Sequence, residues 1–153
     1  MQRVLRILFL GSLALVVSGC VTTEEPPAPV SDVLSADADS AARFLAAQEE
    51  GRLFGRGSGV SMLPIYGENT RVIVTPIPFD DLEPGMIVAY RDSSNRMVVH
   101  RLVSRRGDRW TASGINNPQI DRDAVTRENL IGVVYAFIHG EARDGQGADR
   151  SGT

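Results

Sequence analysis

The feature that most constrains the fold is a series of short strand-forming runs. The runs are rich in Val, Ile, Tyr and Trp, and residues such as Gly, Pro, Asn and Asp separate them. They cover residues 71–77, 85–91, 96–105, 108–114 and 130–138. Residues 91–96 and 105–109 have the composition of hairpin turns. We therefore expect a mainly β domain over residues 53–138, built as either a small barrel or a coiled sheet.

Three other segments surround this domain. Residues 20–38 are polar and Pro-rich, which predicts a flexible linker. Residues 39–52 are rich in Ala and Glu and carry a small apolar stripe at Phe44 and Leu45, which predicts a short α-helix. The polar, Gly-rich residues 139–153 are expected to be a disordered tail.

The first 20 residues, "MQRVLRILFLGSLALVVSGC", have the layout of an export signal over residues 1–19. Arg3 and Arg6 precede an apolar run at residues 7–17, which is shorter than the ~20 residues of a transmembrane helix. The ending "VSGC" resembles a bacterial lipobox, which implies that Cys20 is lipidated and becomes the mature N-terminus. Such a lipid anchor would hold the protein on the extracytoplasmic face of a membrane. The alternatives are an ordinary secretory signal or a short membrane anchor.

Composition excludes several classes of mechanism. All 16 basic residues of this 153-residue chain are Arg, so no lysine can act as a catalytic base. The net charge of −3 argues against a nucleic-acid-binding protein, which usually carries a basic surface. Cys20 is the only cysteine, so the chain has no internal disulfide framework.

The stretch "GRGSGVSMLPIYG", residues 55–67, indicates a serine presented on a turn. Ser61 ends a flexible Gly/Ser run, and Pro64 restricts the backbone three residues later. A serine hydroxyl becomes a good nucleophile only when a neighbouring base takes its proton. Without lysine, the candidate bases are His100, His139, a carboxylate or the α-amine, which lipidation would acylate.

The two histidines lie in different sequence contexts. His100 is part of "RMVVHRLVSR", where strand alternation places it on one face with Val98 and Leu102. An imidazole in such an apolar strand would be neutral and able to accept a proton near pH 7. A lone strand histidine is also compatible with a purely structural core or edge position. His139 follows the last strand and is expected to be a solvated surface residue.

A carboxylate that could orient His100 follows the turn "GINNPQ". Asp121 could accept a hydrogen bond from the imidazole, fixing its tautomer and stabilising the imidazolium. The structural alternative is that Asp121 and Asp123 are solvated turn carboxylates. The sequence pattern alone leaves both alternatives open.

Four blocks in order along residues 54–138 resemble the signal peptidase I superfamily, which includes the LexA-like autoproteases. The blocks are "GVSMLP", "LEPGMIVAYR", "VVHRLVSRRGDRWTASGINNPQID" and "LIGVVYAF". They look most similar to the Ser/His branch found in endoplasmic-reticulum and archaeal signal peptidases. This resemblance implies that Ser61 is the nucleophile, His100 the base and Asp121 the second of two aspartates that follow the histidine.

The same resemblance assigns residues around the nucleophile. The backbone N–H of Ser61 would form part of an oxyanion hole. Some members carry a second hydroxyl donor where this chain has Gly59, and Ser58 could substitute for it. Gly59, Met62 and Pro64 are expected to line the substrate cleft.

The chain departs from the family pattern at two positions. The family block "GDNN" reads "GINN" here, so Ile115 replaces the first aspartate. Met86 replaces the aspartate of "PGD", at a position more suited to a turn than to chemistry. Three outcomes stay open: Asp121 completes a triad, Ser61 and His100 work as a dyad, or the site is inactive.

Together these features predict a membrane-tethered serine endopeptidase that cleaves extended peptide segments without a metal or nucleotide cofactor. A restricted set of substrates is expected, because a lipid replaces the usual transmembrane anchor and the domain is small. The alternative is a catalytically inactive lipoprotein that uses the same fold as a peptide-binding or envelope interaction module. A LexA-like self-cleaving regulator conflicts with the missing lysine and with the export signal.

Overall fold

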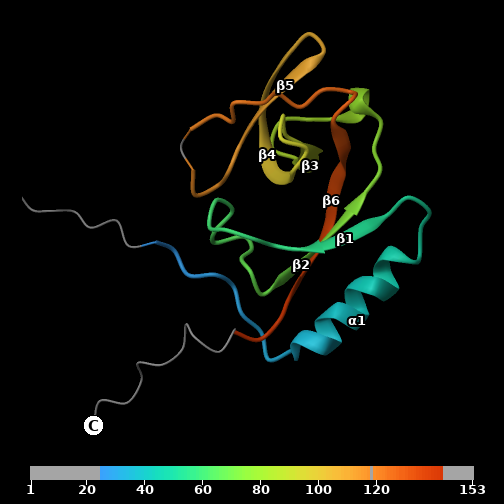
Figure 1. Cartoon of the computed structure of the whole chain (residues 1–153), viewed down its shortest axis with the longest axis vertical. Coiled ribbons are helices and arrows are strands. Elements are labelled where there is room, and N and C mark those ends of the chain that lie inside the picture. The colour runs from blue at the N-terminus through green and yellow to red at the C-terminus, as the bar shows by residue number, and fades with distance from the viewer. Residues whose placement is uncertain (1–24, 118, 143–153) are drawn as a thin grey trace, which may run out of the picture.

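The computed structural model describes residues 25–117 and 119–142, which form one short helix followed by a six-stranded antiparallel sheet (Figure 1). The elements are α1 (Ser35–Ala46), β1 (Leu53–Arg56), β2 (Thr70–Thr75), η1 (Phe79–Asp81), β3 (Ile87–Arg91), β4 (Met97–Arg106), β5 (Arg109–Ser113) and β6 (Leu130–His139). The strand order is β1-β2-β6-β3-β4-β5. The mainly β fold is therefore confirmed. Since β1 and β5 are edge strands, the sheet is open and does not close into a barrel.

Each predicted strand-forming run contains one strand, and β1 is an additional short strand. The sheet separates two apolar clusters, because alternate residues of a strand point to opposite faces. In β3, Val88 and Tyr90 contribute to the first cluster and Ala89 to the second. The first cluster also contains Phe79, Leu82, Leu102, Trp110, Ala112 and Val125. The second contains Met62, Tyr66, Val72 and Val74.

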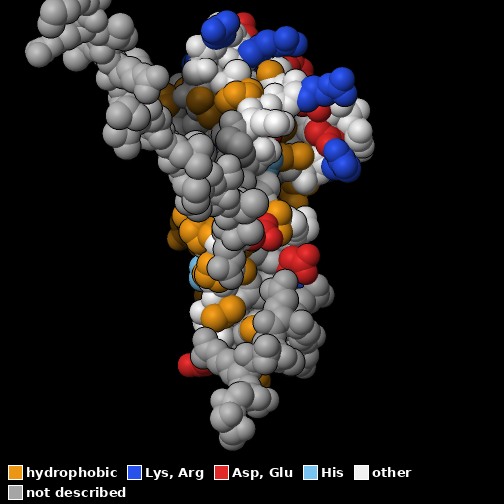
Figure 2. All heavy atoms as spheres, turned by 90° about the vertical axis from the view of Figure 1, so that its left-hand side faces the viewer, with side chains coloured by type: hydrophobic (Ala, Val, Ile, Leu, Met, Phe, Trp, Pro, Cys, Tyr) orange, Lys and Arg blue, Asp and Glu red, His pale blue; other side chains and the backbone are white. Residues whose placement is uncertain are grey.

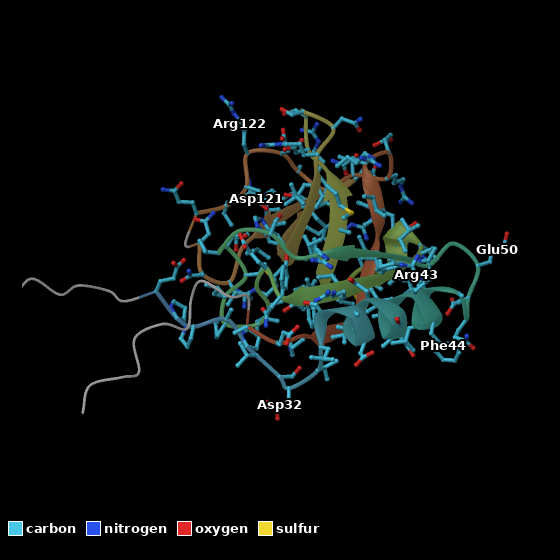
Figure 3. The ribbon with its side chains drawn as sticks, turned by 60° about the horizontal axis from the view of Figure 1, so that its bottom comes forward. Asp32, Arg43, Phe44, Glu50, Asp121 and Arg122 are labelled. Atoms are coloured by element: carbon cyan, nitrogen blue, oxygen red, sulfur yellow. The ribbon has the colours of Figure 1, made fainter. Side chains whose placement is uncertain are left out.

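Helix α1 begins at Ser35, four residues before the expected start. It packs on β2 through Ala38 and Ala42, which are fully buried one turn apart. Phe44, expected to be part of the apolar stripe, points away from the sheet and is 64% exposed (Figure 3). The helix therefore uses small side chains for close packing.

An ion pair between a buried arginine and a half-buried aspartate joins α1 to β2. The Arg71 side chain is 1% exposed, and its Nε donates to Asp39 Oδ1 at 2.7 Å. The remaining Arg71 nitrogens donate to the carbonyl oxygens of Asn69 and Ser35. The hydrogen bond from Arg71, followed by that from Arg56, lowers the pKa of Asp39 to about 2. The Asp39 carboxylate is therefore charged above a pH of about 2, and in that form it is the counterion of Arg71.

Part of the expected flexible linker is docked on the domain. Within residues 25–34, Ser31 N donates to Gly140 O at 3.2 Å. Asn69 Nδ2 donates to Pro29 O at 2.7 Å. These bonds hold the segment along the sheet ends before α1 begins. The proposed signal peptide and Cys20 lie outside the described residues, as does the chain after residue 142.

Within residues 25–117 and 119–142, no helix is long and apolar enough to cross a membrane. The surface charge in the same part of the chain is uneven. Figure 2 shows basic side chains gathered at one end of the molecule, the end that carries the β4–β5 hairpin in Figure 1. Exposed arginines of that hairpin are Arg105, Arg106 and Arg109.

Candidate active site

Ser61 lies on a tight turn between β1 and β2. Gly59 precedes it with φ of +71°, a conformation that glycine adopts without strain. Leu63 N donates to Val60 O at 3.1 Å and Tyr66 N donates to Met62 O at 3.3 Å, so the chain closes into helix-like turns after the serine. The Met62 side chain is 1% exposed and anchors the turn in the second apolar cluster.

The loop after β5 supports the serine from behind. Asn116 N donates to Ser61 O at 2.8 Å, and Asn116 Nδ2 donates to Val60 O at 3.2 Å. Gly114 lies so close to the serine that a Cβ at position 114 would be 2.4 Å from Ser61 O. The "GINN" block therefore positions the serine turn through its backbone and amide groups.

His100 lies in β4, opposite Val88 of β3. Its side chain is 12% exposed and shares a strand face with Val98 and Leu102, as alternation predicted. Leu102 is almost fully buried in the first apolar cluster, which fixes the orientation of this face. His100 thus projects from a rigid strand toward the Ser61 turn.

Asp121 is brought to His100 by a return of the chain along β5. Asp121 N donates to Ala112 O at 2.8 Å, and Val125 and Trp110 exchange two backbone hydrogen bonds of 2.9 Å. Since β5 is the neighbour of β4 in the sheet, this segment beside β5 places Asp121 close to His100 of β4. The next residue, Arg122, points away from the molecule (Figure 3).

The three side chains form a continuous hydrogen-bonded series. Ser61 Oγ lies 2.9 Å from His100 Nε2, and His100 Nδ1 lies 2.7 Å from Asp121 Oδ2. An ionised carboxylate can only accept, so the proton sits on Nδ1 and Nε2 accepts from the serine hydroxyl. This arrangement can deprotonate a serine and stabilise the resulting imidazolium.

A tyrosine that sequence reasoning did not select also contacts Asp121. The Tyr90 hydroxyl donates to Asp121 Oδ2 at 2.7 Å, and the Tyr90 side chain is 1% exposed. Burial, with a further contribution from the Asp121 hydrogen bond, raises the pKa of Tyr90 above its usual range. One oxygen of Asp121 therefore accepts hydrogen bonds from both Tyr90 and His100.

The backbone around the serine offers free donors. Among the described residues, no acceptor is paired with the N–H groups of Ser58, Gly59, Val60, Ser61 or Met62. Free N–H groups at the start of a helical turn favour negative charge nearby. The Ser61 N–H is therefore available to an oxyanion, and the exposed Ser58 side chain lines the same groove.

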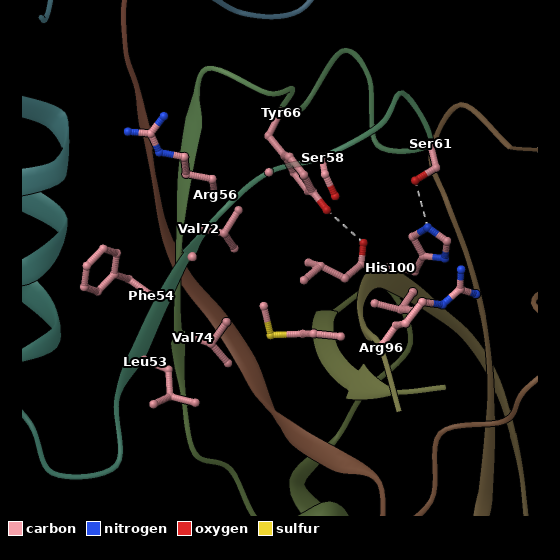
Figure 4. A pocket seen from close by; sticks show the side chains of 15 residues that line it. Leu53, Phe54, Arg56, Ser58, Ser61, Tyr66, Val72, Val74, Arg96 and His100 are labelled. Carbon is pink, nitrogen blue, oxygen red and sulfur yellow. Dashed lines mark hydrogen bonds between the residues drawn. The ribbon is translucent and has the colours of Figure 1, made fainter. Parts of the chain in front are cut away.

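A groove of about 580 Å³ leads to Ser61 and His100, which lie at one end of it (Figure 4). Strand β1 and the loop after it form one side, and Met97–His100 of β4 form the other. Tyr66, Val72 and Val74 lie between the two sides. The groove is thus mostly apolar, and its polar lining residues are Arg56, Ser58, Ser61, Arg96 and His100.

Both sides of the groove include strand edges without a strand partner. Strand β5 pairs with β4 only from Arg101 onward. In an antiparallel pair of strands, every second residue of β4 hydrogen-bonds to β3, and the bond from Leu102 N to Met86 O shows which set does so. Met97 and Val99 belong to the other set, so their backbone N–H and C=O groups point away from β3 and toward the groove. The carbonyl of Val99 already accepts from the Tyr66 hydroxyl at 3.0 Å (Figure 4).

Several expected site residues lie elsewhere. Gly59, Met62 and Pro64 do not line the groove, since Met62 is a core residue and Gly59 and Pro64 shape the turn. The Ile115 side chain packs on the second apolar cluster. An aspartate at position 115 would therefore place its carboxylate against apolar side chains.

The expectation of a solvated His139 is wrong. His139 ends β6, and its Nδ1 lies 2.9 Å from Thr70 Oγ1. The ring stacks on Phe137 at a centroid distance of 6.4 Å. Burial lowers the pKa of His139. This histidine is a structural residue of the sheet.

No group of three or more His, Cys, Asp or Glu side chains that could hold a metal ion occurs within the described ranges. No protein-family model matches the chain, and no curated protein matches it. The functional conclusion therefore depends on the local geometry of Ser61, His100 and Asp121.

Proposed function

We propose that this protein is a signal peptidase-like serine endopeptidase that cleaves extended peptide segments with Ser61, His100 and Asp121. The observation that carries the proposal is the series of hydrogen bonds from Ser61 Oγ through His100 to Asp121, with distances of 2.9 and 2.7 Å. The series stands at the end of a groove large enough for several residues of an extended chain. Asp121 supplies the orienting carboxylate although Ile115 replaces a family aspartate.

In the first half-reaction, Ser61 Oγ attacks the carbonyl carbon of the scissile bond while His100 Nε2 takes the hydroxyl proton. The Ser61 N–H stabilises the negative oxygen of the tetrahedral intermediate, an effect worth roughly 3–4 kcal/mol of barrier per donor in a water-poor site. The C–N bond then breaks, and His100 gives its proton to the leaving amine. An acyl ester on Ser61 remains.

In the second half-reaction, His100 Nε2 takes a proton from water as the water oxygen attacks the ester carbon. The C–O bond to Ser61 breaks, and the proton returns from His100 to Ser61 Oγ. The products are a peptide with a new carboxyl terminus and the regenerated enzyme. Each step uses only protein groups and water.

Substrate binding follows from the strand edges of the groove. An extended peptide can add beside a strand by main-chain hydrogen bonds, and side-chain pockets then select the sequence. The Met97 backbone and the Val99 N–H on β4 are positioned for such bonds, and apolar side chains of the peptide would face Val72 and Val74. The substrate class is therefore a flexible, extended and mostly apolar peptide segment.

The test has two readouts on the full chain. A fluorophosphonate probe reports the serine nucleophile, and a peptide library analysed by mass spectrometry reports cleavage. We expect labelling at Ser61 alone, with the exposed Ser93 and Ser94 as internal controls, and loss of labelling and cleavage in Ser61→Ala and His100→Ala.

Two results would contradict the proposal. One is a wild-type protein that is folded but neither labelled nor able to cleave any peptide. The other is a peptide that binds wild type and Ser61→Ala equally and is never turned over. The second result would favour the inactive peptide-binding or envelope interaction module.

The same proposal places the enzyme on the extracytoplasmic face of a membrane through a lipid on Cys20. The sequence "VSGC" supports this placement. Metabolic labelling with an alkyne fatty acid tests it. We expect incorporation in the wild type and none in Cys20→Ser, whereas equal incorporation in both would exclude Cys20 as the lipidation site.

A further inference from the structure

A buried tyrosine lies next to the proposed catalytic series. Tyr90 of β3 and His100 of β4 are diagonal neighbours on the same sheet face, because Val88 pairs with His100 and Tyr90 pairs with Val98. The Tyr90 hydroxyl donates to Asp121 Oδ2, the same oxygen that accepts from His100 Nδ1. Both distances are 2.7 Å.

Asp121 has little else to fix its side chain. Its backbone is held by the bond from its N–H to Ala112 O, but that bond does not set the rotation of the carboxylate. Within the described residues, Tyr90 and His100 are the two groups hydrogen-bonded to this carboxylate. A buried hydroxyl needs an acceptor, so the position of Tyr90 and the rotation of Asp121 determine each other.

We propose that Tyr90 is a positioning residue that holds the Asp121 carboxylate in the orientation required to accept the His100 Nδ1 proton. This inference rests on the proposed function. It explains how a site without the first family aspartate can retain an oriented histidine. Tyr90 acts through Asp121 and does not line the groove, so it contacts no substrate.

The ionisation state of Tyr90 suits this role. Burial raises the pKa of its hydroxyl, which keeps the proton on Tyr90 and leaves it a hydrogen-bond donor near neutral pH. The charged groups that act on the hydroxyl are Asp121, Asp123 and Asp92. All three are acidic and therefore favour the protonated phenol. Asp123 itself accepts two bonds from Ser93 and so holds the loop beside β3.

The experiment compares wild type with Tyr90→Phe, which removes only the hydroxyl. His100 and His139 are the only histidines, so ¹⁵N-histidine NMR resolves the site and an internal control in one spectrum. We expect wild-type His100 to show a single Nδ1–H tautomer with a slowly exchanging proton. In Tyr90→Phe we expect a mixture of tautomers and loss of that proton signal, with His139 unchanged.

Kinetics supply a second readout when a substrate is in hand. Loss of one hydrogen bond that acts through Asp121 should lower kcat about tenfold and leave KM unchanged. Tyr135→Phe is the matched control, since Tyr135 is an exposed tyrosine whose ring contacts Arg52. It should change neither kcat nor the His100 spectrum.

An unchanged His100 spectrum in folded Tyr90→Phe would overturn the inference and leave Tyr90 as a packing residue. If Tyr90→Phe does not fold, the wild-type protein provides the test. The Tyr90 hydroxyl proton and the His100 Nδ1 proton are both hydrogen-bonded to Asp121 Oδ2, so they lie close enough to give an NMR cross-peak with each other. Its absence would overturn the inference. A His100 spectrum that responds to Tyr90→Phe in a protein that cleaves nothing would support the positioning role and contradict the proposed peptidase activity.

Discussion

Gly114 and Ser61 are in direct contact across the base of the proposed site. A Cβ at position 114 would lie 2.4 Å from the Ser61 carbonyl oxygen and 2.9 Å from the Ser61 Cβ. No side chain fits there unless the serine turn moves. The N–H of Asn116 in the same loop donates to the Ser61 carbonyl oxygen, so this loop holds the serine turn in place.

Gly114→Ala is expected to abolish fluorophosphonate labelling of Ser61. The added methyl group displaces the serine backbone and breaks the 2.9 Å contact with His100. Overpacking of this kind also costs about 1–3 kcal/mol of stability. Labelling of the folded fraction is the measurement. Gly132→Ala is the control, because it creates a similar clash with Thr75 away from the site and should leave labelling intact.

Ile115→Asp, which restores the family residue, is expected to lower stability without raising activity. Ile115 packs on the apolar cluster around Met62 and Tyr66, where a carboxylate has no partner. The cost should be about 1–3 kcal/mol in urea unfolding. Ile115→Val, the control, should cost about 1 kcal/mol. A rise in kcat for Ile115→Asp would show that the first aspartate position still serves the chemistry.

Gly55→Val is expected to raise KM for peptides and leave labelling of Ser61 by a small probe unchanged. Gly55 faces Met97 across the groove, and a Cβ there would lie 3.4 Å from Met97 Cε. The two extra methyl groups of valine would therefore occupy peptide space. Met97→Ala in the same variant should restore KM. A KM that does not change in Gly55→Val would place the substrate outside this groove.

Asp39→Asn is expected to destabilise the protein by about 3 kcal/mol near pH 7, because it leaves Arg71 buried without its counterion. The pKa of Asp39 is lowered from 3.8 to about 2, so its contribution is complete above pH 3.8 and is lost as the pH falls through 2. The stability difference between wild type and variant should therefore shrink between pH 4 and pH 2.

Urea unfolding across this pH range measures the effect. Asp80→Asn is the matched control: Asp80 also contacts two arginines, but it is exposed, so solvent screening should make the effect of its substitution much smaller than that of Asp39→Asn. If the difference in unfolding free energy between wild type and Asp39→Asn were constant from pH 7 to pH 2, Asp39 would act through its shape and not through its charge.

The strands were predictable because β-branched runs and turn residues mark them locally. The short strand β1 was not, since Leu53–Arg56 contains a glycine and no β-branched residue. Whether the sheet closes depends on pairing between its edge strands, which local composition does not encode. Residues 25–34 were expected to belong to a flexible linker, and the structure instead docks them on the domain. Their docking depends on bonds to Asn69 and Gly140, far away in the sequence.

The resemblance of four ordered blocks predicted that Ser61, His100 and Asp121 would lie together, whereas the sequence pattern alone left the place of Asp121 open. Tyr90 could not, because its role depends on the register of β3 against β4 and on the return of the chain along β5. Nothing in "VAYR" distinguishes a tyrosine that meets a carboxylate from one that fills a core. The assignment of Met62 to the cleft was wrong because an apolar side chain after a serine suits either place.

The docked N-terminal segment limits how far Ser61 can lie from Cys20. Glu25 accepts a 3.4 Å hydrogen bond from Asn116, the residue that also supports the serine turn. Four residues lie between Cys20 and Glu25, so the five Cα-to-Cα steps span at most ~18 Å. With a lipid on Cys20, Ser61 would stay within a few nanometres of the bilayer. A peptide that emerges from the membrane would then have a higher local concentration at Ser61 than the same peptide free in solution. The affinity of the site for the two peptides would be the same.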